Sequence, residues 1–228
     1  MIIVINSQNF SETLNSVIAY FRFFQLVGPA LFAPSTRFWS LGTLQQKIVS
    51  YITVIFHIVP IEYRFQASFC IEIIYIIIII FYFSLLVASA IAYKNTSKLP
   101  RAVVVLISVL DGSVMYLIHP IALQMASQDL SRLIMGLDTN MGKIPDFVAI
   151  VLTYICAFLF LYTFSKTFSI TLLFRPTSMQ TTSNIPQLLM MTATYITTIF
   201  SGVSTYLSKI PYCMMTILTA VIYFLSSY

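Results

Sequence analysis

The sequence predicts an all-α membrane protein, a bundle of about six transmembrane helices preceded by an N-terminal amphipathic or imperfectly spanning helix. Its composition is the first reason, because 59% of the 228 residues are hydrophobic and 8% are charged, whereas soluble domains have about 25% charged residues. The second reason is that the apolar residues form long runs without the alternation of barrel strands. A long apolar run in lipid satisfies its backbone groups by folding as a helix.

The longest apolar run, residues 67–93, includes unbroken isoleucine from Ile76 to Ile80. Its only formal charge is Glu72. A bilayer core about 30 Å thick is crossed by about 20 helical residues. The run is longer than that, so we expect this helix to tilt or to extend into water at one end.

The other apolar segments predict the remaining spans of a membrane domain that covers residues 48–228. In chain order, the predicted spans are residues 48–60, 67–93, 102–126, 147–165, 185–207 and 210–228. The joints between them are short, and none has the apolar content of a folded domain. No internal repeat aligns, so the sequence does not favour an inverted-repeat transporter.

Residues 1–47 form a separate N-terminal segment. Within it, residues 14–33 place apolar side chains at close to helical spacing, with Arg22 in their middle and Gly28-Pro29 near their end. Two interpretations stay open for this segment. It lies flat in the membrane interface with Arg22 reaching water, or it spans the membrane imperfectly.

The Lys and Arg residues predict the orientation of the spans. Successive joints alternate sides, and the side richer in Lys and Arg faces the cytosol. This rule places residues 94–101 and the C-terminal end in the cytosol, whether or not residues 14–33 cross. Asn95 begins the glycosylation sequon Asn95-Thr96-Ser97 in that joint, so we expect it to stay free of glycan.

The net charge of +5 is interpreted as this topological bias, and nucleic acid is not an expected partner. The expected partner is the lipid bilayer, with a second copy of the chain or other membrane helices as open alternatives. The sequence leaves both the plasma membrane and an endomembrane open as the location of this multi-pass chain.

Three ionisable residues inside predicted spans form a candidate intramembrane polar site: Glu72, Asp111 and His119. Charges within a membrane are costly, so such residues are candidates for function. Counting helical rise from the cytosolic turn places Glu72 at about 31 Å and His119 at about 26 Å, so the two are candidates for a pair near the outer surface. Asp111 lies at about 13 Å, with no basic residue at its level.

A packing role for these three residues is the favoured interpretation, and a ligand or proton pathway is the alternative. Glu72 can reach water at the end of a long helix, and Asp111 can hydrogen-bond to a neighbouring helix. His119-Pro120 can mark a kink, because proline removes a backbone hydrogen bond one turn back.

The predicted span 185–207 has small and hydroxyl-bearing residues at spacings of three and four, which places them on one helix face. These residues are Thr194, Thr198, Ser201, Gly202 and Thr205. Small residues let membrane helices approach closely, and hydroxyl groups add interhelical hydrogen bonds. A helix-packing seam is therefore favoured over the lining of a hydrophilic pore.

The sequence motifs of common enzymes and metal sites are missing from this chain. It has no Gly-rich phosphate loop, no HExxH, no GxSxG and no cluster of Cys and His. The cysteines, Cys70, Cys156 and Cys213, lie far apart in apolar segments, where we expect buried, inert thiols. We therefore expect no catalytic residue, no cofactor and no metal, and the chain is not expected to be an enzyme.

Residues 20–26, Tyr-Phe-Arg-Phe-Phe-Gln-Leu, with Trp39 downstream, resemble the N-terminal membrane regions of large protist proteins. These are the receptor-type adenylate and guanylate cyclases and the tiny-macrocysts-B-like PAS-domain proteins. The resemblance extends over the rest of the chain by hydropathy alone. In that family the membrane region precedes cytosolic PAS and cyclase domains, which this chain lacks, so no catalytic residue is transferred.

The resemblance implies the membrane-anchoring or sensing region of a receptor-like signalling protein, or a truncated copy of one. The predicted cytosolic end at Tyr228 is where a downstream domain would attach. The alternative is a small transporter or channel subunit in which Glu72, Asp111 and His119 line the route.

Overall fold

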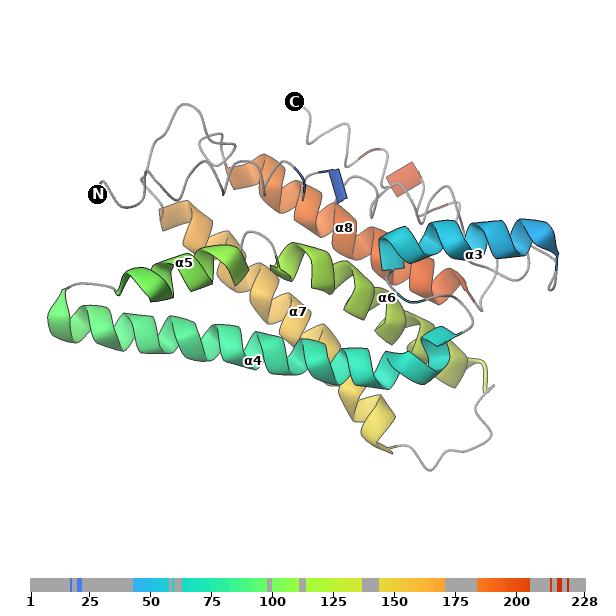
Figure 1. Ribbon diagram of the computed structural model, residues 1–228, viewed down its shortest axis with the longest axis horizontal. Helices are drawn as coiled ribbons and strands as arrows, with labels where there is room; N and C mark the ends of the chain where they lie inside the picture. The colour runs from blue at the N-terminus through green and yellow to red at the C-terminus, as the bar shows by residue number, and fades with distance from the viewer. Residues whose placement is uncertain are drawn as a thin grey trace.

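The computed structural model describes residues 43–57, 59, 63–97, 100–110, 114–136, 144–170 and 184–205, and the single residues Val17, Tyr20, Phe21, Met214, Ile217, Leu218 and Val221. All regular secondary structure in this part of the chain is helical, which confirms the predicted all-α class. The helices are α3 (Leu44–His57), α4 (Arg64–Thr96), α5 (Arg101–Val109), α6 (Met115–Ile134), α7 (Ile144–Ile170) and α8 (Asn184–Ser204), as Figure 1 shows.

Two predicted spans are confirmed as helices that are long and apolar enough to cross a membrane. They are Gln66–Thr96 within α4, with 31 residues, and Ile144–Thr163 within α7, with 20 residues. β-Branched isoleucine is a weaker helix former than leucine or alanine in water. A helix is nevertheless the conformation that satisfies the backbone of such a run in lipid.

The prediction of about six spans is wrong for the described part of the chain, where only α4 and α7 meet the length and hydropathy of a span. The 14 residues of α3 reach about 21 Å, which is shorter than the bilayer core. The apolar stretch of α8, Leu188–Val203, is also short.

The predicted span 102–126 is divided between α5 and α6, with residues 111–113 outside the described part. Helix α6 is not apolar enough to count as a span, because its C-terminal half contains several polar residues between Gln124 and Arg132. The predicted span 210–228 and the N-terminal segment 14–33 lie almost wholly outside the described residues, as do Arg22, Trp39, Asp111 and Cys213.

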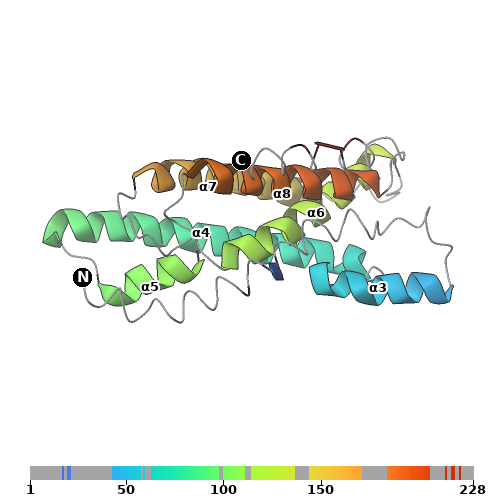
Figure 2. The ribbon, with the colours of Figure 1, turned by 90° about the horizontal axis from the view of Figure 1, so that it is seen from above.

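Helix α6 is the centre of the packing, because it contacts α4, α7 and α8, and its most extensive contact is with α8. Viewed from above, α7 and α8 lie in one layer with α4 beneath them, while α5 lies on the other side of α4 (Figure 2). The helix α4 also packs directly on α7. Side chains of α4, α6, α7 and α8 therefore meet in one shared interior.

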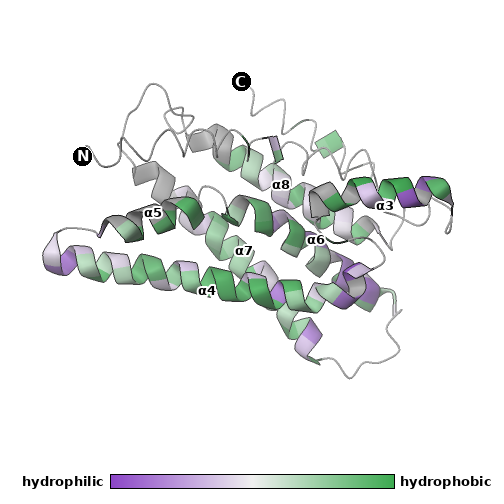
Figure 3. Cartoon of the chain, viewed as in Figure 1, coloured by the Kyte–Doolittle hydropathy of each residue, from purple (hydrophilic) through white to green (hydrophobic). Residues whose placement is uncertain are grey.

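Helix α4 has several polar side chains on the face toward this interior, and many of its isoleucines on the opposite face, although Ile79 lies in the core. Its buried polar and tyrosine residues recur at intervals of three, four and seven, as one helix face requires: Arg64, Ser68, Glu72, Tyr75, Tyr82 and Ser89. Its exposed residues include many that are large and apolar: Ile73, Ile74, Ile77, Ile80, Phe81, Val87 and Ile91. Cys70 is also exposed on this helix, so the expectation that it is buried is wrong. Figure 3 shows hydrophobic residues, in green, along most of the length of α4.

Helix α7 also exposes large apolar side chains, while its buried face combines Thr153 with the apolar residues Ala149, Ile150, Ala157 and Phe160. The exposed set is Phe147, Val148, Val151, Leu152, Ile155, Phe158 and Leu159. Within the most apolar window of each span, only 22% of α4 and 33% of α7 is buried inside the molecule. A core helix of a water-soluble protein has its apolar residues inside instead.

Candidate intramembrane polar site

The candidate site has two buried ionisable residues on neighbouring helices, Glu72 on α4 and His119 on α6. Each is 1% exposed. Glu72 lies on the inward face of α4, one turn before Tyr75. His119 precedes Pro120, which is also buried in α6. The fold therefore places a carboxyl group and an imidazole within the shared interior of the bundle.

The hydrogen bonding of His119 fixes which ring nitrogen has the proton. Its Nδ1 lies within hydrogen-bonding distance of the carbonyl oxygen of Met115, one turn earlier in α6. A carbonyl accepts only, so Nδ1–H donates and Nε2 of the neutral ring is an acceptor. In the described part of the chain, that Nε2 atom is buried without a hydrogen-bond partner.

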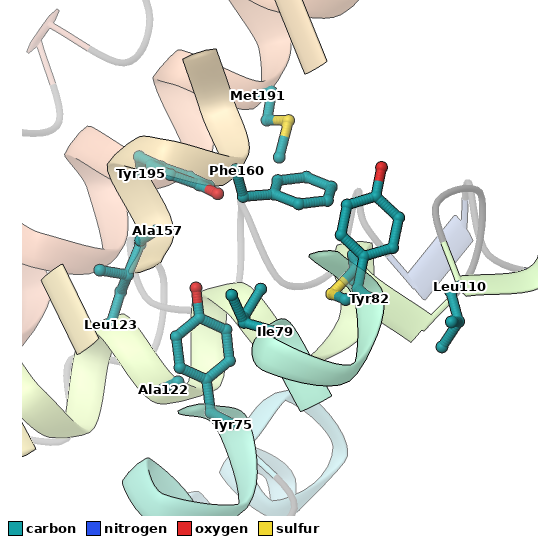
Figure 4. Close-up of a cluster of buried hydrophobic side chains, with 11 residues drawn as sticks. Tyr75, Ile79, Tyr82, Leu110, Ala122, Leu123, Ala157, Phe160, Met191 and Tyr195 are labelled. Atoms are coloured by element: carbon teal, nitrogen blue, oxygen red, sulfur yellow. The ribbon is translucent and has the colours of Figure 1, made fainter. Parts of the chain in front are cut away.

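Aromatic rings from three other helices surround the imidazole of His119. Tyr75 of α4 meets it edge-on at 5.1 Å between ring centroids. Phe160 of α7 lies at 4.4 Å and Tyr195 of α8 lies at 5.6 Å, nearly parallel. Figure 4 shows these three side chains converging from their helices. His119 is therefore the residue at which α4, α6, α7 and α8 all meet.

The structure does not join Glu72 to His119, which were candidates for a pair. Oε1 of Glu72 and Nε2 of His119 are each buried with no hydrogen-bond partner among the described residues. The expected pair assumed one continuous helix from residue 102, whereas the structure has α5 ending at Val109 and α6 beginning at Met115, with residues 111–113 outside the described part. Tyr75, one turn along α4, occupies the position beside His119.

The electrostatic neighbours of Glu72 come from α6 and α7. Asp129 of α6 and Asp146 of α7 lie close enough for their charges to act on the Glu72 carboxyl group. Glu72 in turn acts on the Tyr154 hydroxyl of α7. Sequence reasoning missed Asp129 and Asp146, because they fall in the predicted joint after residue 126 and no local pattern shows which helix ends approach each other.

These carboxyl groups do not form a metal site. Among the described residues, no three His, Cys, Asp or Glu side chains are arranged to hold a metal ion. Asp111, the third predicted member of the polar site, lies outside the described residues. The described part of the site is therefore a carboxyl group and an imidazole with their polar and aromatic surroundings.

A second polar contact joins α6 to α8. Nε2 of Gln124 donates to Oγ of Ser201 at 3.1 Å, and Nε2 of Gln128 donates to Oγ1 of Thr205 at 3.5 Å. Between them, Gly202 lies so close to α6 that an added Cβ atom would be 2.4 Å from Cβ of Ser127. Three members of the predicted seam thus lie against α6.

The other two members of the predicted seam, Thr194 and Thr198, hydrogen-bond within their own helix. Oγ1 of Thr194 donates to the carbonyl of Met190 at 2.8 Å, and Oγ1 of Thr198 donates to the carbonyl of Thr194 at 2.8 Å. The α6 partners of this seam were not predicted. Their signal was the Gln124 and Gln128 pair, one turn apart on one helix face.

The buried groups without hydrogen-bond partners in the described part can accept or donate a hydrogen bond, and two of them can take up a proton. These groups include Oε1 of Glu72, Nε2 of His119, the Tyr75 hydroxyl and the Thr153 hydroxyl. The rings packed around His119 lie within 5.6 Å of it. Proton exchange needs less space than any larger ligand, so it is the chemistry that this packing accommodates best.

Comparison with known proteins gives no match to any protein-family model, curated protein or solved structure. No role for Glu72 or His119 is therefore transferred from a relative. The resemblance of residues 20–26 to protist receptor cyclases stays a prediction.

Proposed function

We propose that this chain is a multi-pass integral membrane protein whose helical bundle is the membrane-anchoring and sensing region of a receptor-like signalling protein. The observation that supports membrane residence is the inverted distribution of its side chains. In α4 the buried face includes Arg64 and Glu72, while the exposed face is isoleucine and phenylalanine. Lipid tails solvate such an outer face, and the helix interfaces take the polar groups.

Water would make the same arrangement unfavourable. Each Å² of apolar surface left in water forgoes about 25 cal/mol of burial free energy. Burying ionisable groups such as Glu72 and Arg64 with part of their hydrogen-bonding capacity unused adds a further cost. In a bilayer the exposed isoleucines cost nothing of this kind, and the inward polar residues avoid lipid.

The sensing role is supported by the resemblance of residues 20–26 and by the packing around His119. A displacement of α6 would change the ring contacts of His119 with α4, α7 and α8 together. Such a shared contact point couples the helices physically. In this proposal the bundle transmits a change at one membrane face to the cytosolic end of the chain.

The test of this role is the length of the native polypeptide. Sequencing of the native transcript should show an open reading frame that continues past the codon for Tyr228 into a PAS or cyclase domain. Immunoblotting with an antibody against the bundle should then detect a protein much larger than 25.8 kDa. A transcript with a stop codon directly after Tyr228 would contradict the role.

A second candidate function, a small transporter or channel subunit, is favoured by one specific observation. Glu72 and His119 are buried in the bundle, and each has an atom without a hydrogen-bond partner among the described residues. A carboxyl and an imidazole within a membrane are typical of proton routes. Asp111 would extend the route in this proposal.

Proton uptake into liposomes tests the second candidate. Purified chain in liposomes with an internal pH dye should show uptake driven by a potassium gradient and valinomycin. Glu72→Gln should abolish the uptake, whereas the control Lys94→Gln, an exposed residue in the last turn of α4, should retain it. Absence of uptake by the wild-type chain, or equal uptake by the Glu72→Gln variant, would rule out this function.

A further inference from the structure

Arg64 is the first residue of α4 and lies two residues before the membrane-spanning stretch Gln66–Thr96. Its side chain is 5% exposed. Its Nε atom donates to the carbonyl oxygen of Val59 at 3.1 Å. Because Val59 precedes the helix, this hydrogen bond turns the guanidinium group back over the N-terminal end of α4.

The rest of the guanidinium group has donors without acceptors. Nη1 and Nη2 of Arg64 are both buried, and neither has a hydrogen-bond partner in the described part of the chain. A guanidinium group has five N–H donors, and the bond to Val59 uses one. The terminal nitrogens are therefore two unused donor groups in a fixed plane.

Among the described residues, no carboxylate compensates the charge of Arg64. Burial lowers the pKa of Arg64 to about 10. At neutral pH the side chain is still positively charged. Burying a cation is unfavourable unless an anion or hydrogen-bond acceptors replace the water that it loses.

The start of α4 adds positive character at the same place. The first turn has no acidic residue, and the N-cap residue Tyr63 makes no side-chain hydrogen bond to the helix. The N-terminal end of a helix has a partial positive charge and amide groups that point outward. Helix starts of this kind are favourable positions for anions.

We propose that Arg64 and the first turn of α4 form a binding site for a phosphate group. The planar guanidinium fork matches two oxygens of a phosphate, which a Lys ammonium group cannot do. The tetrahedral dianion or diester would accept from Nη1 and Nη2 of Arg64 while facing the helix start. A phosphate in this position would satisfy the unused donors Nη1 and Nη2 of Arg64 and place a negative charge beside the guanidinium group.

Two sources supply this chemistry, a soluble phosphate or the phosphate of an anionic lipid. The position of Arg64 at the end of the spanning stretch places it at headgroup depth. The lipid source rests on the proposed membrane residence, whereas the soluble source does not. The experiment therefore includes one arm for each source and a separate readout of membrane insertion.

The test measures the thermal unfolding of the full chain in phosphatidylcholine nanodiscs. One arm adds inorganic phosphate at constant ionic strength, and the other replaces part of the phosphatidylcholine with phosphatidylglycerol. The variant is Arg64→Gln, and the matched control is Lys94→Gln, an exposed cation at the other end of α4. Arg64→Lys keeps the positive charge but removes the planar pair of terminal nitrogens. This variant still tests the site if Arg64→Gln does not fold.

The wild-type chain and Lys94→Gln should become more stable with at least one probe, and the effective probe identifies the source. Arg64→Gln should lose apparent affinity for that probe by about tenfold or more, and Arg64→Lys should lose part of it. The proposed site would be overturned if neither probe stabilised the wild-type chain. It would also be overturned if both Arg64 variants were stabilised as much as the wild-type chain. Failure of the chain to enter nanodiscs would instead contradict the membrane proposal.

Discussion

The imidazole of His119 meets the phenol ring of Tyr75 edge-on across the interface between α6 and α4, with 5.1 Å between ring centroids and planes at 81°. This geometry directs the positive edge of one ring at the electron-rich face of the other, which is favourable for aromatic pairs. Phe160 of α7 and Tyr195 of α8 contact the same imidazole. One small group of rings therefore links the four central helices.

Among the rings around His119, truncation of Phe160 should destabilise the bundle strongly. Its side chain is 1% exposed and contacts the rings of His119 and Tyr82. Phe160→Ala leaves a cavity and should lower the free energy of unfolding by about 3–5 kcal/mol. Reversible unfolding in mixed micelles measures this change. The matched variant Phe158→Ala, at a side chain that is 56% exposed, should cost much less, and equal losses would contradict the placement of Phe160.

Gly202 sets the closeness of α6 and α8. A Cβ atom at this position would lie 2.5 Å from the carbonyl oxygen of Gln124 and 2.4 Å from Cβ of Ser127. Because backbone atoms cannot move aside cheaply, Gly202→Ala should destabilise the bundle by about 1–3 kcal/mol. Gly202→Leu should be worse than Gly202→Ala in thermal unfolding. A series without this size dependence would show that the two helices are not in close contact here.

The hydrogen bond from Gln124 to Ser201, at 3.1 Å, should contribute a measurable coupling between α6 and α8. A double-mutant cycle with Gln124→Leu and Ser201→Ala isolates that coupling from the separate effects of each change. Interhelical hydrogen bonds in membrane proteins contribute about 0.6 kcal/mol on average. We expect a coupling free energy near that value. Strictly additive effects would show that this hydrogen bond does not stabilise the contact between α6 and α8.

The sequence predicted the helices that depend on composition alone. The isoleucine-rich run and the apolar run after Asp146 appear as α4 and α7, because a long apolar run has few alternatives to a helix. The division of the predicted span 102–126 was missed. Hydropathy averages over such a segment and does not detect where one helix ends and the next begins.

The site could be predicted only as separate residues. Glu72 and His119 are conspicuous as ionisable residues in apolar segments, and both lie in the bundle interior. Their neighbours Asp129, Asp146 and Tyr75 are brought together by the packing of α4, α6 and α7. Helix crossing angles and rotations determine those contacts, and neither quantity is encoded in a local sequence pattern.

Cysteine accessibility tests most directly whether the isoleucine-rich face of α4 contacts lipid. On a background without Cys70, Cys156 and Cys213, one variant places cysteine at Ile80, which is 58% exposed and central in the span. The other variant places it at Asn95, which is exposed near the end of α4. We expect a water-soluble maleimide to label the Asn95→Cys chain in intact membranes and to label the Ile80→Cys chain only after denaturation, because thiolate does not form in hydrocarbon. Equally rapid labelling of both variants in intact membranes would show that this face is in water and would contradict the account.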